Sequence, residues 1–101
     1  MDKKIVIIPT YNEKENIENI IRTTFSIFDT DILIIDDNSP DKTADIVKKM
    51  MNEFPDKLFI QERKGKLGLG TAYIHGFKWA FERNYVFIFE MDADFSHDPN
   101  D

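Results

Sequence analysis

The feature that most constrains the fold is an alternation of short apolar runs with amphipathic helical patterns. Four runs rich in branched or aromatic residues are predicted strands, at residues 4–8, 32–36, 58–62 and 85–91. The first two are continuously apolar, which is typical of strands covered on both faces in a parallel sheet. The sequence therefore predicts an α/β fold, with a Rossmann-like, mostly parallel sheet of about four strands and three helices.

Three helical patterns separate the predicted strands. The first follows a predicted cap at Asn12. The second runs from about residue 43 to 54, with Ser39 or Asp41 as its predicted cap, and the third spans about residues 70–83. Pro55 is expected to end the second. The side chains expected to face the sheet are Ile17, Ile20, Ile21, Phe25 and Phe28 in the first helix, Ala44, Val47, Met51 and Phe54 in the second, and Tyr73, Phe77, Ala80 and Phe81 in the third.

Length and composition exclude several classes of protein. A chain of 101 residues has room for one hydrophobic core. The absence of cysteine removes disulfides and thiolate metal sites, and a net charge of −6 argues against nucleic acid as a partner. No apolar run reaches the roughly 18 residues of a membrane span, and no signal peptide is visible.

Polar residues follow every predicted strand, where ligands bind in open parallel sheets. Asp92 and Asp94 come directly after the fourth strand, which we expect to be buried. Two carboxylates at this spacing can share Mg²⁺ or Mn²⁺ through oxygen. Asp-X-Asp is nevertheless a common sequence, and a turn cap at Asp94 is the alternative.

The ends of the first two strands offer groups that suit a nucleoside. Tyr11 presents an aromatic face and Glu13 a carboxylate, while one carboxylate of the pair Asp36 and Asp37 could accept hydrogen bonds from a base or ribose. The alternatives are a packed loop residue at Tyr11, a first-turn helix charge at Glu13, and an Asx turn at Asp37.

The third strand is followed by a basic, glycine-rich stretch, residues 63–70. Backbone amides and cations there could approach a phosphate, although the P-loop ending is missing. A solvated basic loop is the alternative. The sequence holds no Ser/His/Asp or Cys/His arrangement that would support covalent acyl chemistry.

Taken together, residues 6–13, 36–43 and 92–97 resemble the motifs of family 2 glycosyltransferases with the GT-A fold, in the same order. Residues 65–73, together with residues 92–97, are similar to the dolichol-phosphate (polyprenol-phosphate) mannosyltransferase branch in particular. The resemblance implies that residues 1–101 form the N-terminal, nucleotide-sugar-binding part of a longer domain, which stops shortly after the Asp-X-Asp motif. It also implies that the first and fourth strands lie side by side.

The resemblance further implies roles for individual residues. Those implied to line the nucleoside pocket are Pro9, Tyr11, Glu13, Ile35 and Asp37. Asp92, Ala93 and Asp94 would hold the diphosphate and the metal, with Asp94 catalytic. Ser96, where many relatives have Gln, would be a further metal ligand. Lys42 stands where Gly is common, a change expected to matter little on an exposed turn.

The implied reaction is the inverting, metal-dependent transfer of mannose from GDP-mannose to dolichyl or polyprenyl phosphate, at the cytoplasmic face of a membrane. The acceptor would bind a C-terminal half, so the 101-residue chain alone is expected to be inactive. One alternative is a family 2 enzyme that uses a UDP-sugar such as UDP-glucose. Another is a non-catalytic metal- or nucleotide-binding α/β module, but a receiver domain would carry its acidic pair after the first strand, where this chain has Pro9, Thr10 and Tyr11.

Overall fold

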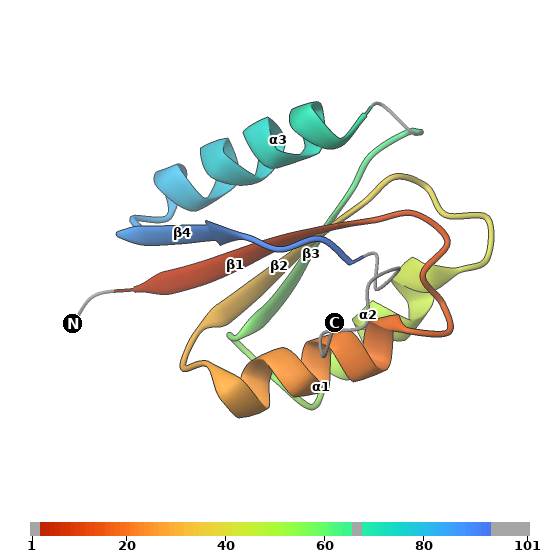
Figure 1. The fold of residues 1–101 in the computed structure, drawn as a ribbon, viewed down its shortest axis with the longest axis horizontal. Coiled ribbons are helices and arrows are strands. Elements are labelled where there is room, and N and C mark those ends of the chain that lie inside the picture. The colour runs from red at the N-terminus through yellow and green to blue at the C-terminus, as the bar shows by residue number, and fades with distance from the viewer. Residues whose placement is uncertain (1–2, 66–67, 94–101) are drawn as a thin grey trace, which may run out of the picture.

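The structure is a computed structural model that describes residues 3–65 and 68–93. Strands and helices alternate in it as the sequence predicts (Figure 1). All strand pairs are parallel, and the order in the sheet is β3-β2-β1-β4. The elements are β1 (Lys4–Thr10), α1 (Ile17–Ile27), β2 (Asp31–Asp36), α2 (Thr43–Met51), β3 (Leu58–Glu62), α3 (Leu69–Glu82) and β4 (Phe87–Glu90).

The central strand β1 pairs with β2 on one side and β4 on the other. Its last residue, Thr10, lies opposite Asp36 of β2, and Ile7 lies opposite Glu90 of β4. The adjacency of the first and fourth strands, implied by the resemblance, is confirmed. The carboxyl ends of these strands therefore meet at one edge of the sheet.

Both faces of the sheet carry a hydrophobic core, as the continuous apolar runs predict. In Figure 1, α1 and α2 lie on one face and α3 on the other. Alternate residues of β1 and β2 point to opposite faces, because side chains alternate along a strand. The α1/α2 face buries Val6, Ile8, Ile32 and Ile34, and the α3 face buries Ile5, Ile7, Leu33 and Ile35.

The apolar stripe predicted for the third helix is right for Tyr73 and Ala80, which pack on the core, and wrong for Phe77 and Phe81. Phe77 and Phe81 are 36% and 79% exposed, whereas Ala72, Trp79 and Ala80 pack on the sheet. The reason is the close approach of α3 to β1: a Cβ on Gly76 would lie 2.7 Å from Ile7 Cγ2. Small side chains permit this approach, so Gly76 and the neighbouring Ala72 and Ala80 face the sheet while Phe77 and Phe81 point outward.

The first helix also differs from its prediction. It begins at Ile17, with Asn16 at the cap position, so Asn12 is not its cap. Thr24 takes an inward place and donates its hydroxyl to Ile20 O at 2.7 Å. Phe28, expected to face the sheet, follows the helix and is 55% exposed.

The second helix stops earlier than predicted, at Met51. Met50 is its buried methionine, whereas Met51 is only partly buried. Phe54 lies in the turns beyond the helix and packs on Phe25 with 4.6 Å between ring centroids. The apolar positions were thus recognised, but the last of them belong to a turn.

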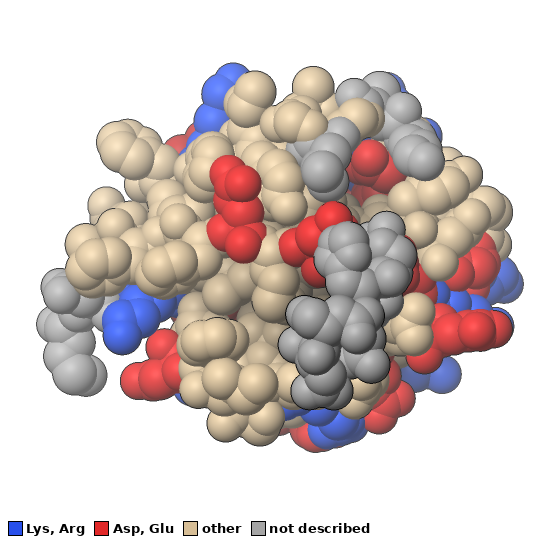
Figure 2. All heavy atoms as spheres, in the orientation of Figure 1, with Lys and Arg blue, Asp and Glu red and all other residues tan. Residues whose placement is uncertain are grey.

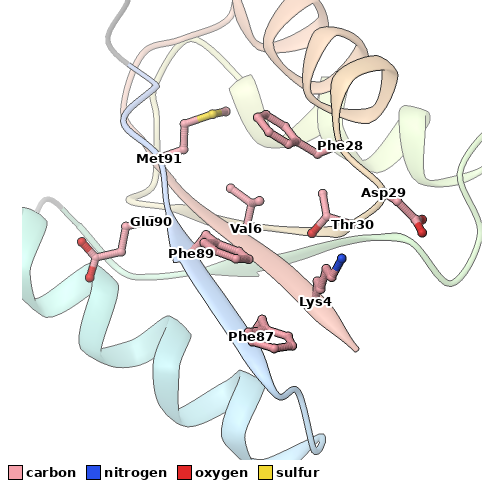
Figure 3. Close-up of a pocket in the computed structure, with 9 residues that line it drawn as sticks. All are labelled: Lys4, Val6, Phe28, Asp29, Thr30, Phe87, Phe89, Glu90 and Met91. Atoms are coloured by element: carbon pink, nitrogen blue, oxygen red, sulfur yellow. The ribbon is translucent and has the colours of Figure 1, made fainter. Parts of the chain in front are cut away.

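The expectation that the fourth strand is buried is wrong, because β4 forms an edge of the sheet. Phe87 and Phe89 are 43% and 51% exposed. Their rings, with that of Phe28, surround Val6 in a cavity of about 670 Å³ on the α1 side of β4 (Figure 3). No helix within residues 3–65 and 68–93 has the length and apolar character needed to cross a bilayer.

Candidate functional site

The carboxyl edge of the sheet brings together most of the site residues expected from the sequence. Pro9 of β1 lies opposite Ile35 of β2, and the Asp37 N–H donates to Thr10 O at 3.1 Å. The side chain of Ile35 is completely buried against the α3 face. A ligand at this edge could therefore reach only the backbone of Ile35.

The two aspartates at the end of β2 have different environments. Asp36 is 1% exposed and accepts hydrogen bonds from the Thr10 hydroxyl at 2.7 Å and from the Ser39 N–H and hydroxyl at 3.0 and 2.7 Å. Asp36 is thus the acceptor that shapes this turn, a role considered for Asp37. Buried carboxylates of this kind need such partners to offset the loss of water.

Three consecutive N–H groups of the β1–α1 loop donate to side chains of the β2–α2 loop, an arrangement that we call the loop bracket. It consists of Asn12 N to Ser39 Oγ at 2.9 Å, Glu13 N to Thr43 Oγ1 at 3.0 Å, and Lys14 N to Asp41 Oδ2 at 3.0 Å. The two loops that carry the expected nucleoside-binding residues are therefore joined. Much of the polar 36–43 motif has this structural role.

Asp41 accepts the Lys14 N–H in the loop bracket. Burial by itself would raise its pKa, but hydrogen bonds from the Thr43 hydroxyl and from the Lys14 and Thr43 N–H groups lower that pKa below its usual value. Asp41 also accepts the first-turn N–H of α2, as its predicted capping role requires, although Lys42 occupies the cap position itself.

Tyr11 and Glu13 lie on the joined loops. Tyr11 is 36% exposed, so a ligand can reach its ring. Glu13 is half-buried, and its carbonyl accepts the N–H groups of Asn16 and Ile17 at 3.0 and 2.8 Å where α1 begins. The backbone of Glu13 thus starts the helix.

Asp37 forms a buried ion pair with Arg63, the first residue after β3. The Arg63 Nε and Nη2 atoms lie 2.6 and 2.8 Å from the two carboxylate oxygens, and the two side chains are 6% and 9% exposed. Arg63 also donates to Thr71 Oγ1 at 3.0 Å and Gly68 O at 3.2 Å. The Arg63 guanidinium is therefore engaged by Asp37 and is not a cation available to a phosphate. Its buried side chain also shows that Arg63 is not part of a solvated loop.

The fourth strand delivers Asp92 to the same edge, since the Met91 N–H still pairs with Ile7 O at 3.0 Å. Asp92 is exposed and Ala93 is buried. Burial raises the pKa of Tyr73 in α3, and the negative charges of Asp92 and Glu90 raise it further. Asp94 and Ser96 lie outside the described residues.

A metal site can be judged here only by the chemistry of its donors. Within residues 3–65 and 68–93, no three His, Cys, Asp or Glu side chains are grouped to hold an ion. The expected ligand set of Asp92, Asp94 and Ser96 would supply only oxygen atoms. Such donors fit Mg²⁺ or Mn²⁺, which prefer oxygen ligands.

The family model described as Glycosyl transferase family 2 matches residues 5–101. The chain belongs to this family. Family 2 enzymes typically use divalent metals. Polyprenol monophosphomannose synthase of Mycolicibacterium smegmatis is 42% identical over 98% of the chain and 38% of that protein. Undecaprenyl-phosphate mannosyltransferase of Micrococcus luteus is 44% identical over 94% of the chain and 39% of that protein.

The family fold is matched in a solved structure as well. A crystal structure of S. aureus TarS, residues 1–349, superposes with a TM-score of 0.75 at 26% identity, over 91% of the chain and 27% of TarS. The four-stranded parallel sheet with three helices thus corresponds to part of a GT-A fold. The chain spans less than two fifths of the length of the curated relatives named above.

Sequence reasoning missed the ion pair between Asp37 and Arg63, because its signal is the register of β2 and β3 and not the sequence by itself. Asp36 lies opposite Glu62 in the register of β2 and β3, so the next residues of the two strands carry opposite charges side by side. That register was the information needed. The loop bracket had no comparable signal, because it joins backbone N–H groups to side chains about thirty residues away.

Proposed function

We propose that the full-length protein transfers mannose from GDP-mannose to a polyprenyl or dolichyl phosphate, with inversion and with a divalent metal. The observation that supports this most is the identity of 42–44% to proteins named as polyprenol-phosphate mannose transferases, over nearly the whole chain. The polar edge of the sheet, with Tyr11, Glu13, Asp37 and Asp92, is consistent with a nucleotide-sugar donor.

In this proposal the chain binds and orients the donor. Tyr11, Glu13 and Asp37 contact the nucleoside, with Pro9 and the backbone of Ile35 beside it. Asp92, Asp94 and Ser96 would hold Mg²⁺ or Mn²⁺, and Ala93, whose side chain is buried in the core, would offer only its backbone to the diphosphate. The metal supplies Lewis-acid stabilisation of the departing diphosphate. Asp94 is the catalytic residue assigned to this chain.

The acceptor accounts for the absence of a proposed general base. A phosphate monoester with a second pKa near 6 is largely dianionic at neutral pH, so its oxygen needs little deprotonation before attack. The region of the full-length protein beyond these residues would bind that lipid. We place the reaction at the cytoplasmic face of a membrane, where a water-soluble donor and a lipid acceptor can meet.

Substitution of Asp94 by Ala in the full-length protein tests the donor and the metal together. We expect metal-dependent GDP-mannose binding, measured by titration calorimetry, to fall at least about tenfold, because one of the charged oxygen ligands is lost. Asp45→Ala, on the exposed side of α2, is the matched control and should bind as the parent does.

Unchanged affinity and metal dependence in Asp94→Ala would contradict the assignment. Competition between GDP and UDP in the same titration separates the mannosyltransferase from an enzyme that uses a UDP-sugar. The isolated 101-residue chain should show no sugar transfer. Measurable turnover by it would contradict the proposal that the lipid acceptor binds another region of the full-length protein.

A further inference from the structure

We propose that Arg63 is a positioning residue that fixes the Asp37 carboxylate for the nucleoside of the donor. The inference rests on the proposed function, in which Asp37 contacts that nucleoside. It depends on the geometry of one ion pair and on the elements that this pair connects.

The pair has the geometry of a rigid fork. Two nitrogen atoms of Arg63 approach two different oxygen atoms of Asp37, at 2.6 and 2.8 Å, and both side chains are more than nine-tenths buried. Two parallel bonds fix the orientation of a carboxylate as well as its position. Without Arg63, Asp37 would be a buried charge with far weaker stabilisation.

Arg63 is itself held from several sides. Its backbone N–H donates to Asp36 O at 2.8 Å, its Nη1 atom to Thr71 Oγ1 at 3.0 Å, and its Nη2 atom also to Gly68 O at 3.2 Å. The guanidinium thus connects the end of β2, the end of β3 and the start of α3. Contacts within the fold therefore hold the guanidinium in position.

The fork does not use all the hydrogen-bonding capacity of Asp37. A carboxylate has roughly four lone-pair sites, and the fork uses about two of them. The remaining sites can each accept one hydrogen bond from a base N–H or a ribose hydroxyl. Asp37 therefore offers single, directed contacts, and their direction is set by Arg63.

The test is the conservative substitution Arg63→Lys in the full-length protein. Lysine keeps the positive charge but cannot form the fork or reach Thr71 at the same time. We expect the dissociation constant of GDP, measured by calorimetry, to rise about tenfold. The donor KM should rise similarly, while kcat at saturating donor stays within about twofold, since in this proposal Arg63 acts on the nucleoside and not on the transferred sugar.

A double substitution distinguishes positioning from direct contact. If Arg63 acts through Asp37, the variant Asp37→Ala/Arg63→Met should bind GDP as weakly as Asp37→Ala alone, within about twofold. Additive losses would overturn the proposal, and so would unchanged GDP affinity in Arg63→Lys. Thr71→Val, which removes one support of Arg63 at an exposed position, should weaken GDP binding by a few-fold even if Arg63→Met fails to fold.

Arg22→Lys is the matched control, because Arg22 forms a similar fork with Glu53 between exposed side chains elsewhere in the molecule. It should leave GDP affinity unchanged. The two proposals fail in different experiments. A parent protein that does not bind GDP would refute the proposed function, whereas normal GDP binding by the parent and by Arg63→Lys would refute only the role of Arg63.

Discussion

Lys42 adopts a left-handed backbone conformation, with φ 68° and ψ 33°. The resemblance places this residue where glycine is common and predicts that the change matters little on an exposed turn. The structure indicates otherwise. A side chain with a Cβ is strained in this region by roughly 1 kcal/mol, whereas glycine enters it freely.

Lys42→Gly should therefore raise the free energy of unfolding of the 101-residue chain by up to about 1 kcal/mol. Urea denaturation followed by circular dichroism measures the change. Asn84→Gly is the matched control, with φ 65° at a residue type that tolerates this conformation, and should have a smaller effect. Equal effects at both positions would show that backbone strain at Lys42 is not the cause.

At the scale of elements, hydrophobic patterning predicts strands better than helix faces. The four strands and their order along the chain could be predicted because continuous runs such as residues 4–8 are recognisable without knowing their partners. The face of α3 could not, because two stripes fit the helical period equally well. Phe77 and Phe81 favour one, and the close contact of Gly76 with Ile7 selects the other.

The same distinction applies to the candidate site. Residues at strand ends, such as Asp37 and Asp92, could be placed at one edge because parallel strands share their direction. Their partners could not be predicted, because these depend on register. Arg63 is the clearest case, since its neighbour across the sheet is fixed only once β2 and β3 are paired.

The loop bracket is predicted to depend on pH through Asp41. A carboxyl whose pKa is lowered on folding stabilises the folded state above its unfolded pKa, and this contribution is lost as the pH falls through the lower, folded value. Asp41→Asn should thus lower the free energy of unfolding by about 1–2 kcal/mol at pH 7. The difference from the parent should shrink below about pH 4, near the ordinary aspartate pKa.

Urea denaturation at pH 7 and pH 3 checks both parts of this prediction. Asp29→Asn, at an exposed loop position, is the matched control and should change stability little at either pH. A deficit in Asp41→Asn that stays constant from pH 7 to pH 3 would assign its effect to something other than the charge.

At the scale of the whole molecule, the two faces of the sheet are unequally covered. The surface over β4 is mostly uncharged, with acidic side chains near its centre (Figure 2). Beneath it lies the cavity with Phe28, Phe87 and Phe89 around Val6 (Figure 3). Exposed apolar surface of this kind binds hydrophobic probes.

The 101-residue chain should therefore enhance the fluorescence of an anilinonaphthalene sulfonate dye at pH 7 while folded. The double substitution Phe87→Ser/Phe89→Ser should remove most of the signal, because it removes two of the apolar walls of the cavity. Phe81→Ser, which is 79% exposed on α3 and outside the cavity, is the control and should retain it. Equal loss in both variants would place the dye elsewhere.

The loop bracket has a consequence for any attempt to exchange parts among family members. Because residues 12–14 are tied to side chains at 39, 41 and 43, the first loop takes its shape from a segment encoded elsewhere in the gene. A chimera that receives only one of the two segments combines N–H donors and side-chain acceptors that come from different proteins. Substrate preference should therefore be transplanted with both segments together, as one cassette made of two separate stretches of sequence.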